Sequence, residues 1–372
     1  MKKILIVFGT RPEAIKMAPV VKEFKKNLKL FDTKVCVTGQ HKEMLYQVLD
    51  FFKIIPDYDL NVMKKNQTLF DLTSNIIIGL KNIMHKFKPD YVFVHGDTTT
   101  SMVSSLSAFY IQSKICHVEA GLRTFNKNSP FPEEINRQIT GRLADYHFSP
   151  TKKSMFNLVS ENIPKKNIVV TGNTVIDSLI YTVKEISNYK NSNIDSIKSK
   201  IKNHDIILVT GHRRENFGKG FIEICKALIE IVKFKPKIKI IFPVHLNPKV
   251  SSTVETYLSG IENIILVKPL AYPEFVWLMN RSKIIISDSG GVQEEAPSLG
   301  KPVLVTRNNT ERPEAVEAGT VMLVGTKTKT IVDETLLLLN DKEYYKSVSK
   351  KENPYGDGKA SKRIVDFLKK IK

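Results

Sequence analysis

Short apolar runs, each ending at a polar loop, recur from one end of this 372-residue chain to the other. Helical patterns separate them, so strands and helices are expected to alternate. Such alternation is the signature of α/β units, whose parallel strands are apolar because helices cover both faces of the sheet. A chain of this length exceeds what one compact core holds. We therefore predict two α/β domains.

The two halves of the chain repeat this pattern without repeating their sequence. A polar stretch rich in Asn, Ser and Lys, residues 188–203, marks the predicted break, and an amphipathic helix is expected at residues 359–372. The predicted strands are residues 3–9, 33–38, 91–94, 115–118 and 168–171 in the first half, and 206–210, 238–243, 264–267, 284–287, 303–306 and 321–324 in the second.

Composition narrows the class of protein. The formal net charge is +19, but the lysines are dispersed along the chain and no DNA- or RNA-binding motif is present, so nucleic acid is not an expected partner. No apolar run approaches the roughly 20 residues that span a bilayer. The apolar run at the N-terminus is too short for a signal peptide, and the three cysteines suit a reducing compartment. We expect a cytoplasmic protein that does not contact membranes.

Three acidic residues stand where α/β sheets place their chemistry. Asp97 follows the predicted strand at residues 91–94, and Glu119 follows the strand at residues 115–118. Open α/β sheets bind ligands beyond the carboxyl ends of their strands. Glu133 follows Pro132 at a predicted helix start, where the helix dipole favours an ionised carboxylate. We expect these three acids to point into one crevice.

Other loops carry groups suited to phosphate. Arg11 lies in the first strand-to-helix loop, with Lys16 about one turn into the helix and Gly9 allowing close approach of a ligand. In the second half, the turn Ser289-Gly290-Gly291 exposes backbone N–H groups at a helix start, and Glu295 near the first helical turn is placed to accept ribose hydroxyls. Each loop alone is also compatible with a purely structural turn.

His212 stands beside two arginines in Gly211-His212-Arg213-Arg214, which should lower its pKa. His95 with Asp97, and His117 with Glu119, have an i, i+2 spacing that would place each pair on one strand face, so a metal stays open as an alternative. No dinucleotide-binding G-x-G-x-x-G is present. These residues predict an enzyme that acts on a nucleotide-linked substrate by transfer, hydrolysis or isomerisation.

The motifs resemble those of one family when they are taken together and in order. The chain contains Gly9-Thr10-Arg11-Pro12-Glu13, His95-Gly96-Asp97-Thr98-Thr99, His117-Val118-Glu119-Ala120-Gly121, Gly211-His212-Arg213-Arg214-Glu215 and Glu311-Arg312-Pro313-Glu314. This set resembles the bacterial non-hydrolysing UDP-N-acetylglucosamine 2-epimerases over essentially the whole chain. The resemblance implies a glycosyltransferase-B-like fold in which two Rossmann-like, doubly wound domains face a cleft. The expected domains are residues 1–171, joined by the C-terminal helix 358–372, and residues 172–357.

The resemblance also implies an activity. It is the reversible conversion of UDP-N-acetylglucosamine to UDP-N-acetylmannosamine by a homodimer, through elimination of UDP to 2-acetamidoglucal and its re-addition, without metal or nicotinamide cofactor. The product would supply surface polysaccharide synthesis. Carried over by position, the catalytic residues would be Asp97, Glu119, Glu133 and His212. The further substrate contacts would be Arg11, Lys16, Leu270, Phe275, Ser289, Gly290, Gly291, Glu295 and Arg312.

Family members can bind a second UDP-N-acetylglucosamine as an activator, and the residues that match this site are Gln40, Glu134, Arg213 and His245. Glu43 and Asn66 occupy positions that are Gln and Arg in some relatives, so the resemblance does not imply strict activation. Three rival functions stay open. They are a sugar transferase on the same fold, a hydrolysing epimerase, and a nucleotide-sugar sensor without catalysis.

Overall fold

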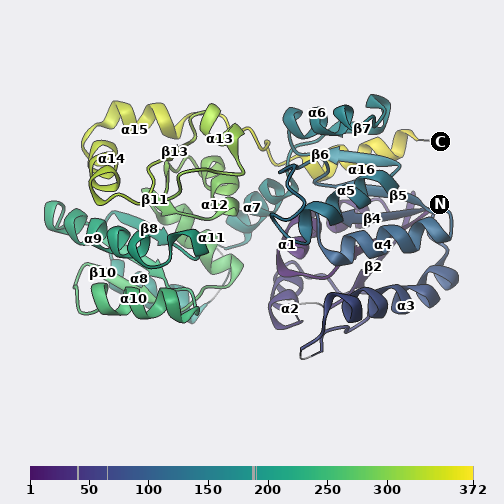
Figure 1. The fold of residues 1–372 in the computed structure, drawn as a ribbon, viewed down its shortest axis with the longest axis horizontal. Coiled ribbons are helices and arrows are strands. Elements are labelled where there is room, and N and C mark those ends of the chain that lie inside the picture. The colour runs from purple at the N-terminus through teal and green to yellow at the C-terminus, as the bar shows by residue number, and fades with distance from the viewer. Residues whose placement is uncertain (40–41, 65, 187–188, 190, 372) are drawn as a thin grey trace. The chain divides into compact units, whose positions relative to one another are not determined.

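The computed structural model describes residues 1–39, 42–64, 66–186, 189 and 191–371 (Figure 1). Its internal contacts divide the chain into two compact units. Unit 1 comprises Met1–Ser178 and Tyr355–Lys372, and unit 2 comprises Leu179–Pro354. No helix within the described ranges combines the length and the apolar character that crossing a bilayer requires.

Unit 1 is built on a parallel sheet, which has seven strands in the described residues, in the order β3-β2-β1-β4-β5-β6-β7. The strands are β1 (Lys2–Phe8), β2 (Phe31–Val37), β3 (Tyr58–Asp59), β4 (Tyr91–His95), β5 (Lys114–Val118), β6 (Tyr146–Ser149) and β7 (Ile168–Val170). The helices are α1 (Arg11–Lys25), α2 (Lys42–Phe51), α3 (Leu69–Phe87), α4 (Thr99–Tyr110), α5 (Glu133–Leu143), α6 (Lys152–Ser160) and α16 (Ala360–Lys370), with a 3₁₀ turn η1 (Lys165–Asn167). Helix α7 (Thr174–Glu185) begins in unit 1 and continues into unit 2.

Unit 2 is built on a second parallel sheet, with six strands in the part of the chain described, in the order β10-β9-β8-β11-β12-β13. The strands are β8 (Ile206–Thr210), β9 (Lys239–Pro243), β10 (Ile264–Val267), β11 (Ile284–Ser287), β12 (Val303–Val305) and β13 (Val321–Leu323). The helices are α8 (Ser192–Ile201), η3 (Arg214–Asn216), α9 (Lys219–Phe234), α10 (Pro248–Leu258), α11 (Tyr272–Arg281), α12 (Gly290–Glu295), η4 (Ala296–Leu299), α13 (Pro313–Glu317), α14 (Thr328–Asn340) and α15 (Lys342–Ser349).

Both strand orders reverse direction at one point, so both sheets are doubly wound. In unit 1 the reversal lies between β1 and β4, and in unit 2 it lies between β8 and β11. Strand order reversal opens a crevice beyond the carboxyl ends of the two strands, which is where such sheets bind ligands. The predicted α/β fold with two domains is confirmed. The loops with the predicted chemistry follow the strands at or beside these two points.

The C-terminal segment returns to unit 1. Helix α16 packs on α1, as the yellow helix of Figure 1 shows. Buried Asp177 on α7 accepts hydrogen bonds from the backbone N–H groups of Ala360 (3.1 Å) and Ser361 (2.9 Å) at the start of α16. These two N–H groups have no partner within the helix, so the carboxylate of a distant residue satisfies them.

Some elements differ from the pattern expected of the sequence, and the two-residue strand β3 was also not predicted. Strand β6 was not predicted, because its short run alternates an aromatic residue with the polar residues His147 and Ser149; both are nevertheless buried. The polar stretch 188–203 contains helix α8, which buries Ile194, Ile197 and Ile201. Their i, i+3, i+7 spacing is the helical signal that the polar composition concealed.

Candidate active site

A single buried carboxylate, that of Glu13, joins the two turns at the switch point of unit 1. It accepts hydrogen bonds from the backbone N–H groups of Gly9 (3.0 Å) and Thr10 (2.8 Å) in the turn after β1. It also accepts from the hydroxyls of Thr98 (2.7 Å), in the turn after β4, and Ser101 (3.2 Å), in the first turn of α4. Because both turns share one acceptor, the predicted site residues that follow them are fixed relative to each other.

The packing of the fold requires a glycine at position 9. A Cβ added there would lie 2.0 Å from Thr38 Oγ1 and 2.6 Å from Thr100 Oγ1, and these two hydroxyls are hydrogen-bonded to each other at 2.9 Å. The sequence suggested that a glycine here allows a ligand to approach. The structure shows instead that the backbone passes directly over a pair of threonine side chains.

Arg11 and Lys16, which were expected to share one side of α1, contact different partners. Arg11 Nη1 lies 4.0 Å from Met44 Sδ on α2. Lys16 forms an ion pair with Glu119, the residue that follows β5. Lys16 therefore belongs to the acidic part of the site in this structure.

Glu119 is a buried carboxylate with three polar groups around the same oxygen. Its Oε2 pairs with Lys16, accepts a hydrogen bond from Asn173 Nδ2 at 2.9 Å and lies 3.7 Å from His95 Nε2. Burial works to raise the pKa of Glu119, but the charges of Lys16 and His95 outweigh it and hold the pKa well below its usual range. The side chain is therefore ionised at neutral pH.

Asp97 is placed beside Glu119 by the sheet, because β4 and β5 are paired and Gly96 N donates to Val118 O at 2.9 Å. The Asp97 carboxylate forms an ion pair with Arg137 of α5. Asn136 Nδ2 of the same helix donates to Asp97 O at 3.0 Å. The turn after β4 is thus bound to the helix that begins with the third predicted acid.

The helix start predicted at Glu133 is confirmed, and Glu133 is half-buried at the first position of α5. Its neighbour Glu134, a predicted activator contact, is fully buried, accepting from Thr124 N (3.0 Å) and Phe125 N (3.2 Å) and lying 3.3 Å from Arg137 Nη1. Burial raises the pKa of Glu134, but these hydrogen bonds lower it below its ordinary value. In this structure Glu134 supports the loop between Glu119 and α5.

The spacing argument for two His–acid pairs fails for a backbone reason. Gly96 and Glu119 have φ values of +65° and +62°, so the alternation of a strand stops at both points. His117 turns its Nε2 toward Gly96 O at 2.7 Å, and burial lowers its pKa to about 3, which keeps the ring neutral. His95, by contrast, lies beside Glu119.

In unit 2, the fully buried carboxylate of Asp288 organises the turns after β8 and β11. It accepts from the backbone N–H groups of His212 and Arg213, both at 2.9 Å, and from Asn216 Nδ2 at 3.2 Å. His212 Nδ1 lies 3.3 Å from Asp288 Oδ1. Asp288 therefore fixes both the loop and the ring of the predicted catalytic histidine.

His212 is a partly exposed ring that stacks against His245 with centroids 5.7 Å apart. Partial burial lowers its pKa; Asp288 acts in the opposite direction, and Arg213, His245 and Arg307 add to the lowering. The predicted direction of the shift is confirmed. A neutral imidazole has a single N–H group; because Nδ1 faces the Asp288 carboxylate, Nε2 donates to a phosphate oxygen only when the ring is protonated.

The Ser289-Gly290-Gly291 turn opens helix α12, as predicted. A Cβ added at Gly290 would lie 3.7 Å from Arg312 Nη2 and 3.8 Å from Arg213 Nη2, so two guanidinium groups flank this turn. Arg312 also pairs with Glu294. Arg307, which the sequence did not single out, is buried nearby and pairs with Glu215 at 2.6 Å. These arginines each pair with a glutamate in this structure.

Glu295 lies at the last position of the short helix α12 (Gly290–Glu295), just beyond its first turn. Its Oε2 accepts a hydrogen bond from Tyr272 OH at 2.9 Å. Its Oε1 lies 3.7 Å from the position that a Cβ on Gly291 would occupy, so the carboxylate is close to the glycine turn. Phe275 is half-buried on α11 with Tyr272, and Leu270 is half-buried just before that helix.

Of the residues near the predicted activator site, Gln40 lies outside the described residues, and Glu43 and Asn66 are exposed.

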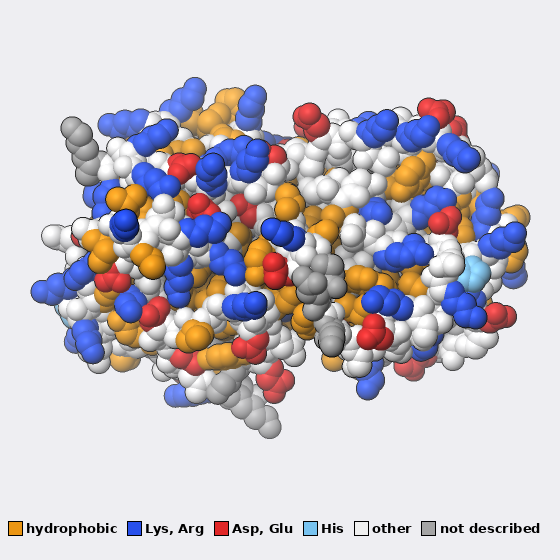
Figure 2. Space-filling model, turned by 180° about the vertical axis from the view of Figure 1, so that it is seen from behind, with side chains coloured by type: hydrophobic (Ala, Val, Ile, Leu, Met, Phe, Trp, Pro, Cys, Tyr) orange, Lys and Arg blue, Asp and Glu red, His pale blue; other side chains and the backbone are white. Residues whose placement is uncertain are grey.

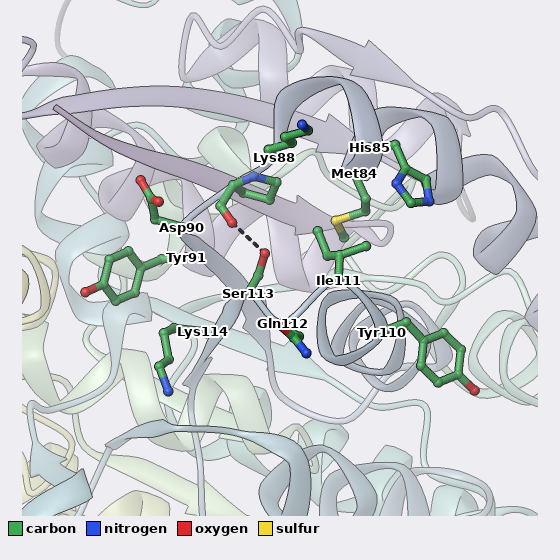
Figure 3. A pocket seen from close by; sticks show the side chains of 11 residues that line it. Met84, His85, Lys88, Asp90, Tyr91, Tyr110, Ile111, Gln112, Ser113 and Lys114 are labelled. Atoms are coloured by element: carbon green, nitrogen blue, oxygen red, sulfur yellow. Dashed lines mark hydrogen bonds between the residues drawn. The ribbon is translucent and has the colours of Figure 1, made fainter.

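A pocket of about 750 Å³ is lined by Asp90, Ser113 and Lys114, among others, at the amino ends of β4 and β5 (Figure 3). It lies on the edge opposite the acids, where parallel sheets do not place their sites. On the face in Figure 2, Lys and Arg side chains are scattered among other types, as a solvated surface predicts.

Comparison with known proteins gives consistent matches. The family model described as UDP-N-acetylglucosamine 2-epimerase matches residues 22–369. The chain is 56% identical over 378 residues to the UDP-N-acetylglucosamine 2-epimerase of Campylobacter jejuni, covering 100% of this chain and 98% of that protein.

Two solved structures are similar over nearly their full length. One is the Neisseria meningitidis UDP-GlcNAc 2-epimerase bound to UDP-GlcNAc, with a TM-score of 0.87, 50% identity and coverage of 99% of this chain and 100% of that chain. The other is Staphylococcus aureus MnaA in a co-structure with UDP, with a TM-score of 0.88, 46% identity and coverage of 99% and 96%.

Proposed function

The chain belongs to the UDP-N-acetylglucosamine 2-epimerase family, and we infer that it is an isomerase that interconverts UDP-N-acetylglucosamine and UDP-N-acetylmannosamine. One observation supports this inference most. Two of the predicted catalytic acids, Asp97 and Glu119, follow paired strands at the carboxyl edge of a doubly wound sheet, and Glu119 is held ionised. A carboxylate must be ionised to accept a proton from a sugar carbon.

We propose that the reaction proceeds by elimination and re-addition. A carboxylate takes the C2 proton, the C2–H electron pair becomes the C1–C2 double bond, and the C1–O bond breaks with its electron pair leaving on UDP. The product of this half-reaction is 2-acetamidoglucal. A UDP oxygen then adds back to C1, and C2 receives a proton on its opposite face. Asp97, Glu119 and Glu133 are the proposed proton-handling groups.

The departing UDP needs stabilisation of its negative charge, and unit 2 supplies groups of the right kind. We propose that the Ser289-Gly290-Gly291 turn, with Arg312 beside it, binds the diphosphate, and that His212 donates to a phosphate oxygen. Arg11 of unit 1 remains a proposed contact of the UDP-sugar, whereas Lys16, the other contact expected from this helix, is paired with Glu119. Glu295 is the proposed acceptor for ribose hydroxyls, and Phe275 and Leu270 are the proposed neighbours of the base.

A proton NMR time course tests the activity against its rivals. Incubation with UDP-N-acetylglucosamine alone, with EDTA present, should yield UDP-N-acetylmannosamine until a constant ratio is reached. Incubation with UDP-N-acetylmannosamine should reach the same ratio from the other side. Lasting release of UDP with free N-acetylmannosamine would indicate a hydrolysing epimerase. Turnover only after addition of a sugar acceptor would indicate a transferase, and binding without turnover would indicate a sensor.

The homodimer and the activator site stay proposals. Exposed apolar side chains on three consecutive helices of unit 1 support self-association, because α3 packs on α4 and α4 packs on α5. These side chains are Ile78, Phe109, Ile135 and Ile139.

Of the proposed activator contacts, Arg213 follows His212 and His245 stacks on the His212 ring in unit 2, whereas Glu134 is buried in unit 1.

A further inference from the structure

The two oxygens of the Glu119 carboxylate have different surroundings. Oε2 carries the ion pair with Lys16 and the hydrogen bond from Asn173, and His95 Nε2 approaches it at 3.7 Å. Oε1 lies 3.7 Å from the position of a Cβ on Gly96, the residue before Asp97. A glycine at this position therefore keeps the space next to Oε1 free of a side chain, at the turn that carries Asp97.

The backbone of Glu119 is held in an uncommon conformation. Its φ of +62° lies in the left-handed region, which a residue with a side chain adopts only when its surroundings impose it. The surroundings do impose it on both sides. Val118 O accepts from Gly96 N at 2.9 Å, and Ala120 N donates to Phe148 O at 3.1 Å. The left-handed turn sends the carboxylate back toward α1, where Lys16 meets it.

We propose that Lys16 is a positioning residue for Glu119: it holds Oε2, so that Oε1 is presented beside Asp97 as an ionised oxygen ready to accept the C2 proton. This inference rests on the proposed function for the identity of the proton. It assigns to Lys16 a role different from that of a phosphate contact. The exposures support it, because only 14% of the Lys16 side chain and 8% of the Glu119 side chain are accessible to solvent.

Polar and charged side chains approach the Glu119 carboxylate from several neighbouring segments. Lys16 approaches Glu119 from α1, His95 approaches from the end of β4, and Asn173, which is neutral, approaches from the residue before α7. Asp97, the nearest acid along β4, has its charge directed to Arg137. Because burial alone would favour the protonated acid, loss of the lysine charge should raise the pKa of Glu119.

A pH–rate comparison of Lys16→Met and Lys16→Arg tests this role. With the pKa of Glu119 raised, the Met variant should lose kcat progressively as pH falls through that higher pKa and recover part of it in alkaline buffer. We expect its kcat deficit to be at least about tenfold larger at pH 6 than at pH 9. The Arg variant should keep the wild-type profile. A loss confined to KM and equal at every pH would show a phosphate contact instead and overturn the proposal.

A second measurement needs no substrate and so separates this proposal from the proposed function. Glutamate carboxyl ¹³C signals are titrated in the wild type, in Lys16→Met and in Glu119→Gln, which identifies the Glu119 signal by its absence. The signal should titrate well below the usual glutamate range in the wild type, and its midpoint should move to higher pH in Lys16→Met. Identical titration of Glu119 in both proteins would overturn the proposal, whether or not the chain proves to be an epimerase.

Discussion

Replacement of Glu119 by Gln should lower kcat by at least about 10²-fold, because general acid–base groups typically contribute 10²- to 10⁴-fold. The amide keeps the size of the side chain but cannot take a proton. It also removes the negative charge that Lys16 compensates in this buried site. Since the diphosphate is proposed to bind to unit 2, the affinity for UDP should change little.

The measurement combines steady-state kinetics of epimerisation with calorimetric titration of UDP. Glu262→Gln is the matched control, because it makes the same chemical change at an exposed position. The Glu262 side chain is 95% exposed and is not part of the proposed chemistry. That control should have wild-type kcat. A proton-transfer group contributes at least roughly 10²-fold to kcat. If the kcat of Glu119→Gln stays within about threefold of the wild-type value, which is well inside that minimum, Glu119 is not a catalytic residue.

Replacement of Asp288 by Ala should both destabilise unit 2 and impair the reaction. The change leaves the N–H groups of His212 and Arg213 and the amide of Asn216 without their buried acceptor. An unsatisfied buried donor costs about 1–3 kcal/mol, so we expect a loss of about 3 kcal/mol or more. The His212 ring also loses the partner of its Nδ1, and we expect kcat to fall at least about tenfold.

Urea unfolding and kinetics at a temperature where the variant stays folded measure the two effects separately. Asp288→Asn is the conservative comparison, because the amide retains one acceptor oxygen in the same volume. It should lose less stability than the Ala variant. If Asp288→Ala unfolds at the wild-type urea concentration and keeps wild-type kcat, the carboxylate does not organise the His212 loop.

Local pattern was sufficient to predict most of the fold. The apolar runs at β4, β5, β8 and β11 were long enough, and flanked by clear enough turns, to be placed within a residue or two of their observed bounds. The failures have physical causes. Strand β6 is stabilised by burial between β5 and β7 and not by its own composition, and α8 is a helix because three isoleucines face the core.

The acids of the candidate site could be predicted from the sequence, but the residues that pair with these acids could not. A carboxylate just beyond a strand end has a local signature, which is why Asp97 and Glu119 could be named. The pairing of Lys16 with Glu119 joins segments 103 residues apart, and the loop contacts of Asp288 span up to 76 residues. The left-handed backbone at Glu119 also leaves no mark in the sequence, so the direction of the carboxylate could not be predicted.

Solvent isotope incorporation at C2 shows whether the C2 proton leaves the sugar during epimerisation. The enzyme is incubated in D₂O with UDP-N-acetylglucosamine, without added cofactor or acceptor, and both epimers are examined by NMR. Removal and return of the C2 proton by carboxylates that exchange with solvent predicts deuterium at C2 of UDP-N-acetylmannosamine and, at equilibrium, at C2 of UDP-N-acetylglucosamine as well. Conversion of one epimer to the other with protium retained at C2 would contradict the account.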